Sequence, residues 1–208
     1  MGCRFERPGF LLIALIALFG SADVQAADLK IAVFAGGCFW CMEPPYDKID
    51  GVLETISGYA NGNIPNPTYE QVSAGGTSYV EAVQVTYDAE ITSYEDLLEI
   101  YWPNIDPLDG DGQFCDQGDS YRPAIFYEDE TQREAAEASK RRVADEYELD
   151  GIATSIEKLT SFYPAEDYHQ NYYQKNPFRY NYYRWACGRD ARLKELWGSN
   201  ERLSLFNQ

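Results

Sequence analysis

A short stretch of glycine, cysteine and aromatic residues constrains this chain more than any other: Gly36-Gly37-Cys38-Phe39-Trp40-Cys41-Met42-Glu43. The apolar run at residues 29–35 predicts a buried strand, and residues 39–48 can form a helix. Cys38 is therefore expected where a strand passes into a helix. Backbone N–H groups at a helix start favour a thiolate and can lower a cysteine pKa from about 8.5 to roughly 3.5–7.5. The sequence thus predicts an activated thiol at Cys38.

Other interpretations of these cysteines are open. A cysteine is often a small buried core residue, but the paired glycines before Cys38 and the two aromatic residues after it favour a nucleophile. The spacing of Cys38 and Cys41 also fits a thioredoxin-like redox pair or half of a zinc site. Zinc is disfavoured because the sequence has no second such pair and one histidine, His169. No metal and no organic cofactor are expected.

The composition predicts one well-packed domain. The chain has 208 residues, of which 45% are hydrophobic and 15% aromatic, and it shows no internal repeat or low-complexity linker. Its formal net charge of −17 argues against a nucleic-acid partner, because phosphate binding needs clustered Lys and Arg.

The first 26 residues are interpreted as a secretory signal peptide. Arg4 and Arg7 precede an apolar run at residues 10–19, and Val24-Gln25-Ala26 supplies a small-x-small cleavage pattern. We therefore expect residues 27–208 to form the mature domain, exported to the periplasm. An uncleaved membrane anchor is the alternative, although the run is short against the ~20 residues that span a bilayer. Four cysteines would remain in a compartment that permits disulfides: Cys38, Cys41, Cys115 and Cys187.

The pattern along the mature chain predicts an α/β (α+β) two-layer sandwich, a mixed sheet with flanking helices. Strands are expected at residues 29–35, 52–59, 79–87, 123–127 and 152–159. Helices are expected at residues 39–48, between an N-cap at Ser93 and Pro103, and at 129–146. Residues 104–120 predict a long functional loop that holds Cys115 and Asp116. From residue 162 onward we expect a long irregular segment rich in aromatic residues.

Glu81 is out of place on its predicted strand. With a period of two it shares a face with the apolar residues Val83 and Val85. Burial raises the pKa of a carboxyl, and a carboxylic acid that is protonated near neutral pH can donate a proton. The alternative is a glutamate at the strand end that reaches water. His169 is interpreted as a hydrogen-bonded structural residue, with a role as base for Cys38 as the alternative.

Several blocks of the sequence occur together in the order and spacing of one known family. They are Gly37-Cys38-Phe39-Trp40, Ser57-Gly58-Tyr59, Asn66-Pro67-Thr68-Tyr69, Glu81-Ala82-Val83, Asp116, Tyr121-Arg122, Tyr168-His169-Gln170 and Cys187-Gly188. Over residues 30–198 the chain resembles the A-type peptide methionine sulfoxide reductases. The resemblance implies a fold related to the ferredoxin-like arrangement. It also implies reduction of the S epimer of methionine sulfoxide, free or in proteins, as a repair of oxidised proteins.

The resemblance implies a role for each residue that it matches. Cys38 attacks the sulfoxide sulfur while a neutral Glu81 protonates the oxygen. Tyr69 and Tyr121 would hydrogen-bond that oxygen, and Asp116 would join the network around it. Phe39 and Trp40 would bind the methyl group of the substrate. Cys38 would become a sulfenic acid, which a second cysteine condenses to a disulfide that a thioredoxin-like donor reduces.

The chain departs from the family pattern at two cysteines. The family commonly has Gly at position 41 and Asn at position 115. Cys187 is expected to resolve the sulfenic acid, with Cys41 as the first alternative and Cys115 as the second; Cys115 could instead be a packed thiol or a partner for Cys187. A rival function is general thiol–disulfide exchange by Cys38 and Cys41, and another is a secreted binding domain. The mature protein is expected to be a monomer without stable membrane association.

Overall fold

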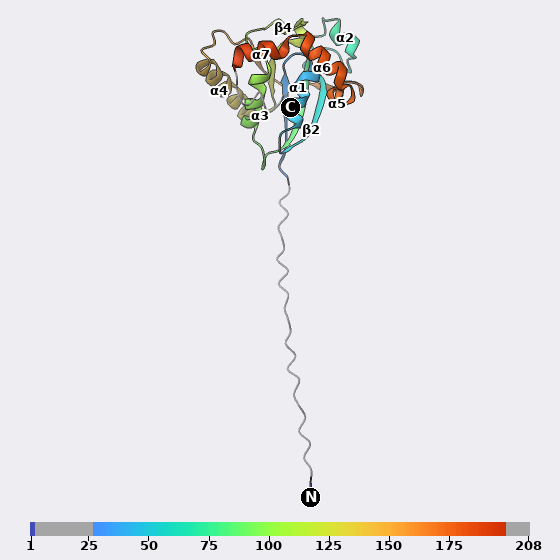
Figure 1. Cartoon of the computed structure of the whole chain (residues 1–208), viewed down its shortest axis with the longest axis vertical. Coiled ribbons are helices and arrows are strands. Elements are labelled where there is room, and N and C mark those ends of the chain that lie inside the picture. The colour runs from blue at the N-terminus through green and yellow to red at the C-terminus, as the bar shows by residue number, and fades with distance from the viewer. Residues whose placement is uncertain (3–26, 199–208) are drawn as a thin grey trace.

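A six-stranded mixed sheet forms the centre of the computed structural model, which describes residues 1–2 and 27–198 (Figure 1). Its strand order is β7-β6-β1-β3-β2-β8, and all neighbours are antiparallel except β6 and β7. The strands are β1 (Leu29–Ala35), β2 (Val52–Ala60), β3 (Val80–Asp88), β6 (Ala124–Tyr127), β7 (Ser155–Lys158) and β8 (Phe162–Pro164).

The main helices cover one face of this sheet. They are α1 (Phe39–Asp47), α3 (Tyr94–Tyr101) and α4 (Glu130–Glu146), and their buried residues join Phe34, Val83 and Val85 in one core cluster. A smaller cluster on the other face includes Val33 and Ala82. The order β1-α1-β2-β3-α3-β6 with the antiparallel arrangement β6-β1-β3-β2 is the ferredoxin-like βαββαβ unit. The expected two-layer sandwich is confirmed.

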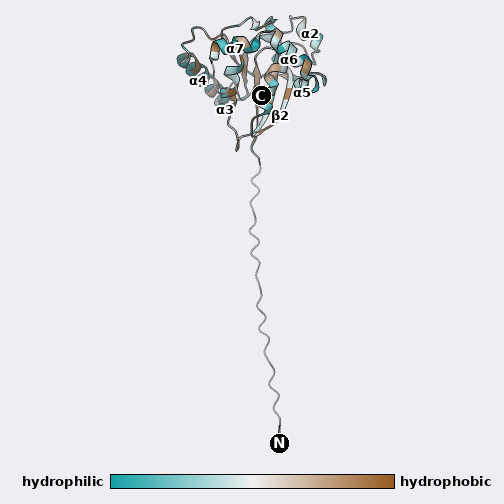
Figure 2. Cartoon of the chain, in the orientation of Figure 1, coloured by the Kyte–Doolittle hydropathy of each residue, from teal (hydrophilic) through white to brown (hydrophobic). Residues whose placement is uncertain are grey.

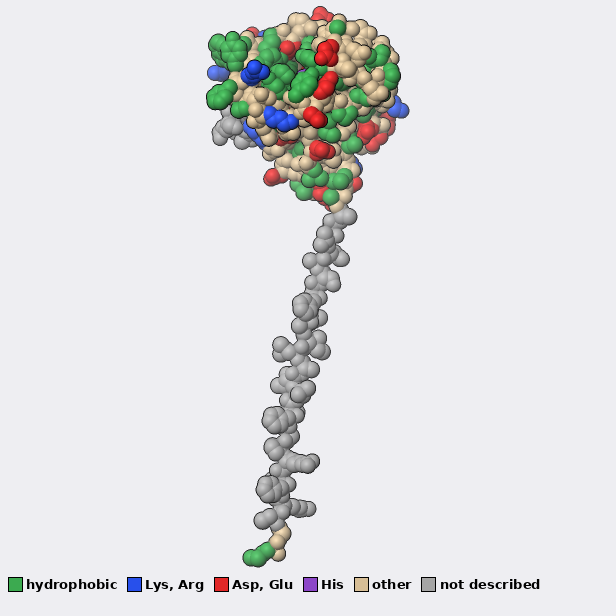
Figure 3. All heavy atoms as spheres, turned by 90° about the vertical axis from the view of Figure 1, so that its right-hand side faces the viewer, with side chains coloured by type: hydrophobic (Ala, Val, Ile, Leu, Met, Phe, Trp, Pro, Cys, Tyr) green, Lys and Arg blue, Asp and Glu red, His purple; other side chains and the backbone are tan. Residues whose placement is uncertain are grey.

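Hydropathy follows these layers. Figure 2 shows hydrophilic residues predominating on the outer helix α4, whose buried positions are few. Figure 3 shows Asp and Glu side chains spread over one face, as a net charge of −17 leads one to expect.

Most strands lie within a residue or two of their predicted positions. The expected strands at residues 29–35, 52–59, 79–87 and 123–127 match β1, β2, β3 and β6. The strand predicted at residues 152–159 is shorter, and it is followed by β8, which has only three residues and so too little alternation to detect. The predicted loop contains a hairpin of two-residue strands, β4 (Gly112–Gln113) and β5 (Asp116–Gln117). It ends in the 3-10 turn η2 (Asp119–Tyr121).

The C-terminal segment is rich in aromatic residues but not irregular, so that part of the fold prediction was wrong. It contains α5 (Tyr172–Lys175), α6 (Pro177–Ala186) and α7 (Arg189–Trp197). Pro177 begins α6, where a missing N–H costs nothing, and Gly188 takes a left-handed φ of 67° between α6 and α7. The prediction failed because tyrosines occur on buried and exposed positions alike, which removes the apolar contrast of an amphipathic helix.

Arg189 fixes this C-terminal segment against the turn after β1. Its buried guanidinium donates hydrogen bonds to the carbonyl oxygens of Gly36 (3.0 Å) and Asn104 (2.6 Å). A Cβ at Gly36 would lie 2.5 Å from Ile105 Cγ2, and Gly37 has a φ of +80°. The two glycines are therefore required by close packing and by the turn itself. Together these contacts set the position of Cys38.

The predicted signal peptide, residues 1–26, lies outside the described part of the chain apart from its first two residues. Within the described ranges, the helices are too short or too polar for any of them to cross a membrane.

Candidate active site

Cys38 lies where the sequence predicts it, between β1 and α1. It is the N-cap residue of α1, with a φ of −53° and a ψ of 122°, and only 6% of it is exposed. The first amide of the helix, Phe39 N–H, donates a hydrogen bond to Glu81 Oε2 at 3.1 Å. The head of α1 therefore holds the Glu81 carboxyl beside the Cys38 sulfur.

Glu81 is a buried carboxyl that is protonated at neutral pH. It belongs to β3, faces the α1 side of the sheet with Val83, and is 2% exposed. Burial raises its pKa to about 8, and the negative charges of Asp116 and Cys41 add to that rise, while the Phe39 N–H opposes it. The interpretation that Glu81 reaches water is wrong, because the carboxyl is buried and has the raised pKa that a proton donor requires.

The two free thiols in the described chain, Cys38 and Cys41, form a hydrogen-bonded buried pair. Burial raises the pKa of Cys38, and its hydrogen bond with Cys41 and the charge of Glu81 raise it further. The pKa of Cys41 is lowered to about 6 by the hydrogen bond with Cys38 and by the charges of Arg189 and Arg184. The lowered pKa that the sequence predicts for Cys38 is therefore wrong in direction. The amide expected to stabilise its thiolate binds Glu81 instead.

Tyr69, Tyr121 and Asp116 complete the group that the resemblance implies. Tyr69 begins α2 (Tyr69–Ser73), and its hydroxyl is hydrogen-bonded to that of Tyr121 at the end of η2. Burial and the charges of Glu81 and Cys38 raise the pKa of both tyrosines, which keeps their hydroxyls protonated. Asp116 acts electrostatically on Cys38 and Glu81, and it accepts a hydrogen bond from Tyr183 of α6. The structure thus brings all five predicted catalytic residues together.

An aromatic cavity of about 350 Å³ opens beside this group. Its lining comprises Trp40, Tyr69, Tyr168, His169, Tyr172, Asn176 and Arg179. The Tyr172 ring stacks on Trp40 with centroids 3.7 Å apart. Phe39 is 1% exposed and packs beneath His169, with ring centroids 4.9 Å apart. Of the two predicted substrate-binding aromatics, Trp40 forms the wall and Phe39 supports it from behind.

His169 is a structural residue of this wall. Its Nδ1 accepts a hydrogen bond from Trp40 Nε1–H at 3.0 Å, and burial lowers its pKa. The ring is therefore neutral with its proton on Nε2, which lies 3.9 Å from a Glu166 carboxylate oxygen. Because the acceptor nitrogen is occupied by Trp40, His169 has no free lone pair with which to deprotonate Cys38.

Sequence reasoning missed the residues that hold these side chains in place. Glu166 accepts hydrogen bonds from Tyr59 Oη (2.8 Å) and from the Tyr69 backbone N–H (2.9 Å). Gln170 pairs with both backbone groups of Ser57, accepting at 2.9 Å and donating at 2.8 Å. Glu166 gives no signal in the sequence, whereas Gln170 belongs to a block that carries the family resemblance.

The other two cysteines in the described part of the chain, Cys115 and Cys187, form a disulfide. Cys115 is exposed in the predicted loop, and Cys187 ends α6. Of the alternatives that the sequence left open for Cys115, pairing with Cys187 is the one found. The sulfurs and the Asp116 carboxylate lie within 4.8 Å of one another, but sulfurs bonded to each other are not metal ligands, so only the carboxylate is available.

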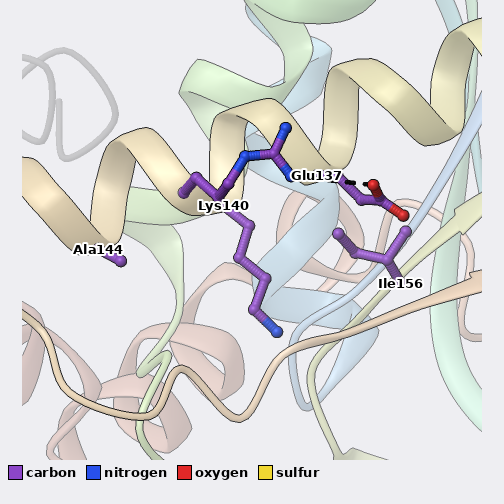
Figure 4. A pocket seen from close by; sticks show the side chains of 5 residues that line it. Glu137, Lys140, Ala144 and Ile156 are labelled. Carbon is purple, nitrogen blue, oxygen red and sulfur yellow. Dashed lines mark ion pairs between the residues drawn. The ribbon is translucent and has the colours of Figure 1, made fainter.

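A second cavity, of about 360 Å³, lies beside α4 (Figure 4). It is lined by Glu137, Lys140, Arg141, Ala144 and Ile156, and Glu137 forms an ion pair with Arg141. None of the predicted site residues lines it, whereas Trp40 and Tyr69 line the aromatic cavity, so we place the chemistry at the aromatic cavity.

Fold and site together define an oxidoreductase that works through a cysteine thiol next to a protonated carboxyl. A family model described as peptide methionine sulfoxide reductase matches residues 30–201, and the chain belongs to this family. The resemblance seen in the sequence is thereby confirmed.

Relatives and solved structures agree with this assignment. The peptide methionine sulfoxide reductase MsrA of Bacillus licheniformis is 50% identical over 175 residues, which cover 84% of this chain and 97% of that protein. The MsrA/MsrB protein of Vibrio cholerae is 46% identical over 93% of this chain, which spans about half (53%) of its length. The structure of methionine sulfoxide reductase A of Corynebacterium diphtheriae matches with a TM-score of 0.69 and 31% identity, covering 77% of this chain and 81% of that one.

Proposed function

We propose that this chain reduces the S epimer of methionine sulfoxide, free and in proteins, with Cys38 as the nucleophile. The observation that carries the proposal is the position of Glu81. Its carboxyl has a raised pKa and accepts a hydrogen bond from the Phe39 N–H at the start of α1, directly after Cys38. A sulfoxide oxygen must receive protons before it can leave, and Glu81 is the acid available beside the thiol.

The residues of the site supply every proton and bond that the proposed reaction step needs. The Cys38 sulfur forms a bond to the sulfoxide sulfur, and its proton passes to the Glu81 carboxylate that is left once Glu81 has protonated the sulfoxide oxygen. Glu81 gives its proton to the sulfoxide oxygen, to which Tyr69 and Tyr121 donate hydrogen bonds. The protonated oxygen then moves from the substrate sulfur to the Cys38 sulfur as the bond between the two sulfurs breaks, so methionine leaves and Cys38 becomes a sulfenic acid. Trp40 offers the apolar wall for the methyl group.

The experiment that tests this function compares the two epimers of methionine sulfoxide. Reduced protein with dithiothreitol is expected to convert the S epimer to methionine and to leave the R epimer, as measured by chiral chromatography. Turnover of neither epimer, together with Cys38- and Cys41-dependent reduction of protein disulfides, would favour the rival thiol–disulfide oxidoreductase.

We infer that Cys41 resolves the sulfenic acid and that the Cys115–Cys187 pair then passes electrons to it. The sequence places Cys187 first, but in the structure Cys187 is bonded to Cys115 while Cys41 touches Cys38. The Cys41 thiol would attack the Cys38 sulfenic acid, giving a Cys38–Cys41 disulfide and water. The reduced Cys115–Cys187 dithiol would reduce that disulfide by exchange, leaving its own two sulfurs oxidised. A thioredoxin-like dithiol would then reduce the Cys115–Cys187 disulfide.

Cys41→Ser is expected to form one methionine per enzyme and to accumulate the Cys38 sulfenic acid, because serine cannot form a disulfide. Trapping with dimedone and mass spectrometry of the intact protein measure that species. Cys187→Ser provides the control, and it should form the Cys38–Cys41 disulfide without accumulating sulfenic acid. Sulfenic acid that accumulates in Cys187→Ser but not in Cys41→Ser would return the resolving role to Cys187.

We further propose that the mature protein begins after Ala26 and acts as a periplasmic monomer. The charged and apolar pattern of the first 26 residues supports export, and the single compact domain supports a monomer. The test is the N-terminal residue of the recovered protein. Ala27 at the N-terminus of periplasmic protein would show that the signal peptide is cleaved, whereas an intact N-terminus in the membrane fraction would indicate an anchor.

A further inference from the structure

The aromatic cavity has one charged side chain in its lining. Five of the lining residues are aromatic, and the other two are Asn176 and Arg179. The His169 ring is neutral, because burial lowers its pKa and its Nδ1 accepts a hydrogen bond from Trp40. Arg179 is therefore the ionised group of this cavity. Pockets of such composition use their few polar groups to select a ligand and to fix its orientation.

The helix α6 presents Arg179 on the side that faces the site. Arg179 and Tyr183 are four residues apart, so they lie on the same side of the helix. Tyr183 packs edge-on against Trp40, with ring centroids 5.8 Å apart, and its hydroxyl donates a hydrogen bond to Asp116. Arg179 lies one turn before it, in the first turn of α6, where the helix dipole adds partial positive charge. The exposed guanidinium is thus placed at the mouth of the cavity.

Arg179 has no acceptor of its own among the described residues. Each of the other arginines in residues 27–198 is paired with a carboxylate or bonded to a backbone carbonyl. These arginines, each with one partner, are Arg122 (Glu157), Arg133 (Glu130), Arg141 (Glu137), Arg142 (Glu99), Arg184 (Asp190), Arg189 (Gly36) and Arg192 (Asp106). Acids are not scarce, since the chain has 34 Asp and Glu against 17 Lys and Arg. The N–H donors of Arg179 are therefore available to a substrate.

Negative charge lies at a different part of the cavity. Glu166 and Glu70 both act electrostatically on Tyr168, which lines the cavity. Glu70 belongs to α2, and Glu166 is held beside the same helix by a hydrogen bond from the Tyr69 N–H. A carboxylate that enters the cavity is therefore repelled from the α2 side and attracted toward Arg179 on α6.

We propose that Arg179 binds a carboxylate of the substrate close to the methionine sulfoxide, and so makes the enzyme favour sulfoxides that have such a neighbour. The inference rests on the proposed function, because it requires methionine sulfoxide to occupy the aromatic cavity. A guanidinium matches a carboxylate with two parallel hydrogen bonds. The carboxylate can belong to an aspartate or glutamate next to the sulfoxide in a protein, or it can be the α-carboxylate of a free or C-terminal methionine sulfoxide.

This binding step is separate from the chemistry at sulfur. Arg179 is not one of the groups that contact the reacting atoms, so its ion pair stabilises the bound substrate and the transition state equally. Such uniform binding lowers KM and leaves kcat unchanged. An ion pair on an open surface contributes little, but the aromatic walls of the cavity exclude water from one side of this pair. The preference should therefore be measurable, and it should weaken as salt is added.

The test measures kcat and KM, with dithiothreitol as the reductant, for matched pairs of peptides that contain methionine S-sulfoxide. In most pairs both ends are blocked, and the members carry either Glu or Gln at one of the two positions before or after the sulfoxide. A further pair ends at the sulfoxide residue, with a free carboxylate or with an amide. For the wild-type protein we expect at least one carboxylate peptide to have a KM at least about fivefold lower than its neutral match, with kcat within about twofold.

Two variants and a control assign this preference to its residue. Arg179→Gln should raise the KM of the preferred carboxylate peptide to that of its neutral match, because glutamine has no charge. Arg179→Glu should reverse the preference. The matched control is Arg141→Gln, which makes the same change in net charge at an exposed arginine of α4, and it should keep the wild-type preference.

Three results would overturn the proposal. They are equal KM values for carboxylate and neutral peptides in the wild type, a preference that Arg179→Gln retains, and an equal loss of preference in Arg141→Gln, which would assign it to net charge. A preference confined to the glutamate peptides would identify acidic neighbours as the carboxylate that binds, and one confined to the free C-terminus would identify the α-carboxylate. Wild-type protein that reduces none of the peptides, the neutral ones included, would instead contradict the proposed function.

Discussion

Replacing Cys38 by serine is expected to abolish the formation of methionine from methionine S-sulfoxide. A serine hydroxyl is far less nucleophilic than a thiol, and it cannot take up the sulfoxide oxygen as a reversible sulfenic acid. We expect less than about 0.1% of the wild-type rate, consistent with losses of this size when a covalent nucleophile is removed. The measurement is methionine formed per enzyme in a single turnover of pre-reduced protein from which dithiothreitol has been removed.

Cys115→Ser is the matched control for this experiment, because it makes the same chemical change at an exposed cysteine outside the buried pair. It should still form methionine in the first turnover. A burst near one methionine per enzyme in Cys38→Ser would place the nucleophile elsewhere. A thermal unfolding curve like that of the wild type would show that the loss comes from chemistry and not from misfolding.

How far the sequence predicts this fold depends on the clarity of local patterns. The strands β1, β2 and β3 are buried, and their apolar residues occur either at alternate positions or in a continuous run. The N-cap of α3 is Ser93, whose side chain accepts a hydrogen bond from the Asp96 N–H. Such signals are local, so they can be read from a single chain. The helices α5, α6 and α7 were missed because their docking rests on distant contacts, such as Arg189 to Gly36, which are 153 residues apart.

The site residues likewise divide into those with a clear local pattern in the sequence and those without one. Cys38 and Glu81 stand out from their own neighbourhoods, one by its glycines and aromatics and the other as a carboxyl on an apolar face. Tyr69 and Tyr121 have no local signal, and Asp116 has only that of the long loop that holds it, so the family resemblance was needed to give all three a role. The direction of the Cys38 pKa was wrong because it depends first on burial, then on contacts with Cys41 and Glu81, and Glu81, 42 residues from Phe39 in the sequence, occupies the Phe39 amide.

The surroundings of the two buried thiols shift their pKa values in opposite directions. Burial and the hydrogen bond with Cys41 raise the pKa of Cys38, whereas the hydrogen bond with Cys38, together with the charges of Arg189 and Arg184, lowers that of Cys41. In the resting pair the negative charge is therefore on Cys41, and the protonated Cys38 thiol lies next to the neutral Glu81 carboxyl. A substrate sulfoxide is polar but uncharged, so this resting state admits it without repelling it. Chemistry then needs the proton of Glu81 at the sulfoxide oxygen.

Glu81→Gln should lower the rate of methionine formation by about 10²- to 10⁴-fold, since an amide keeps the shape and the Phe39 hydrogen bond but supplies no acidic proton. The wild-type rate should also fall as pH rises through about 8, because Glu81 is protonated below its pKa and ionised above it. Single-turnover rates between pH 6 and pH 10 measure both effects. In Glu81→Gln the decline centred on pH 8 should disappear.

Glu43→Gln is the matched control for this variant. Glu43 is likewise fully buried on α1, and burial raises its pKa to about 7, but its Oε1 accepts a hydrogen bond from the Asn171 N–H instead of facing the thiol. Because it touches none of the proposed reacting atoms, Glu43→Gln should keep the rate within about threefold and retain the decline near pH 8. Two results would show that Glu81 is not the acid: a Glu81→Gln rate close to that of the wild type, or a wild-type rate that does not decline above pH 8. The tyrosine hydroxyls would then be the groups that protonate the sulfoxide oxygen.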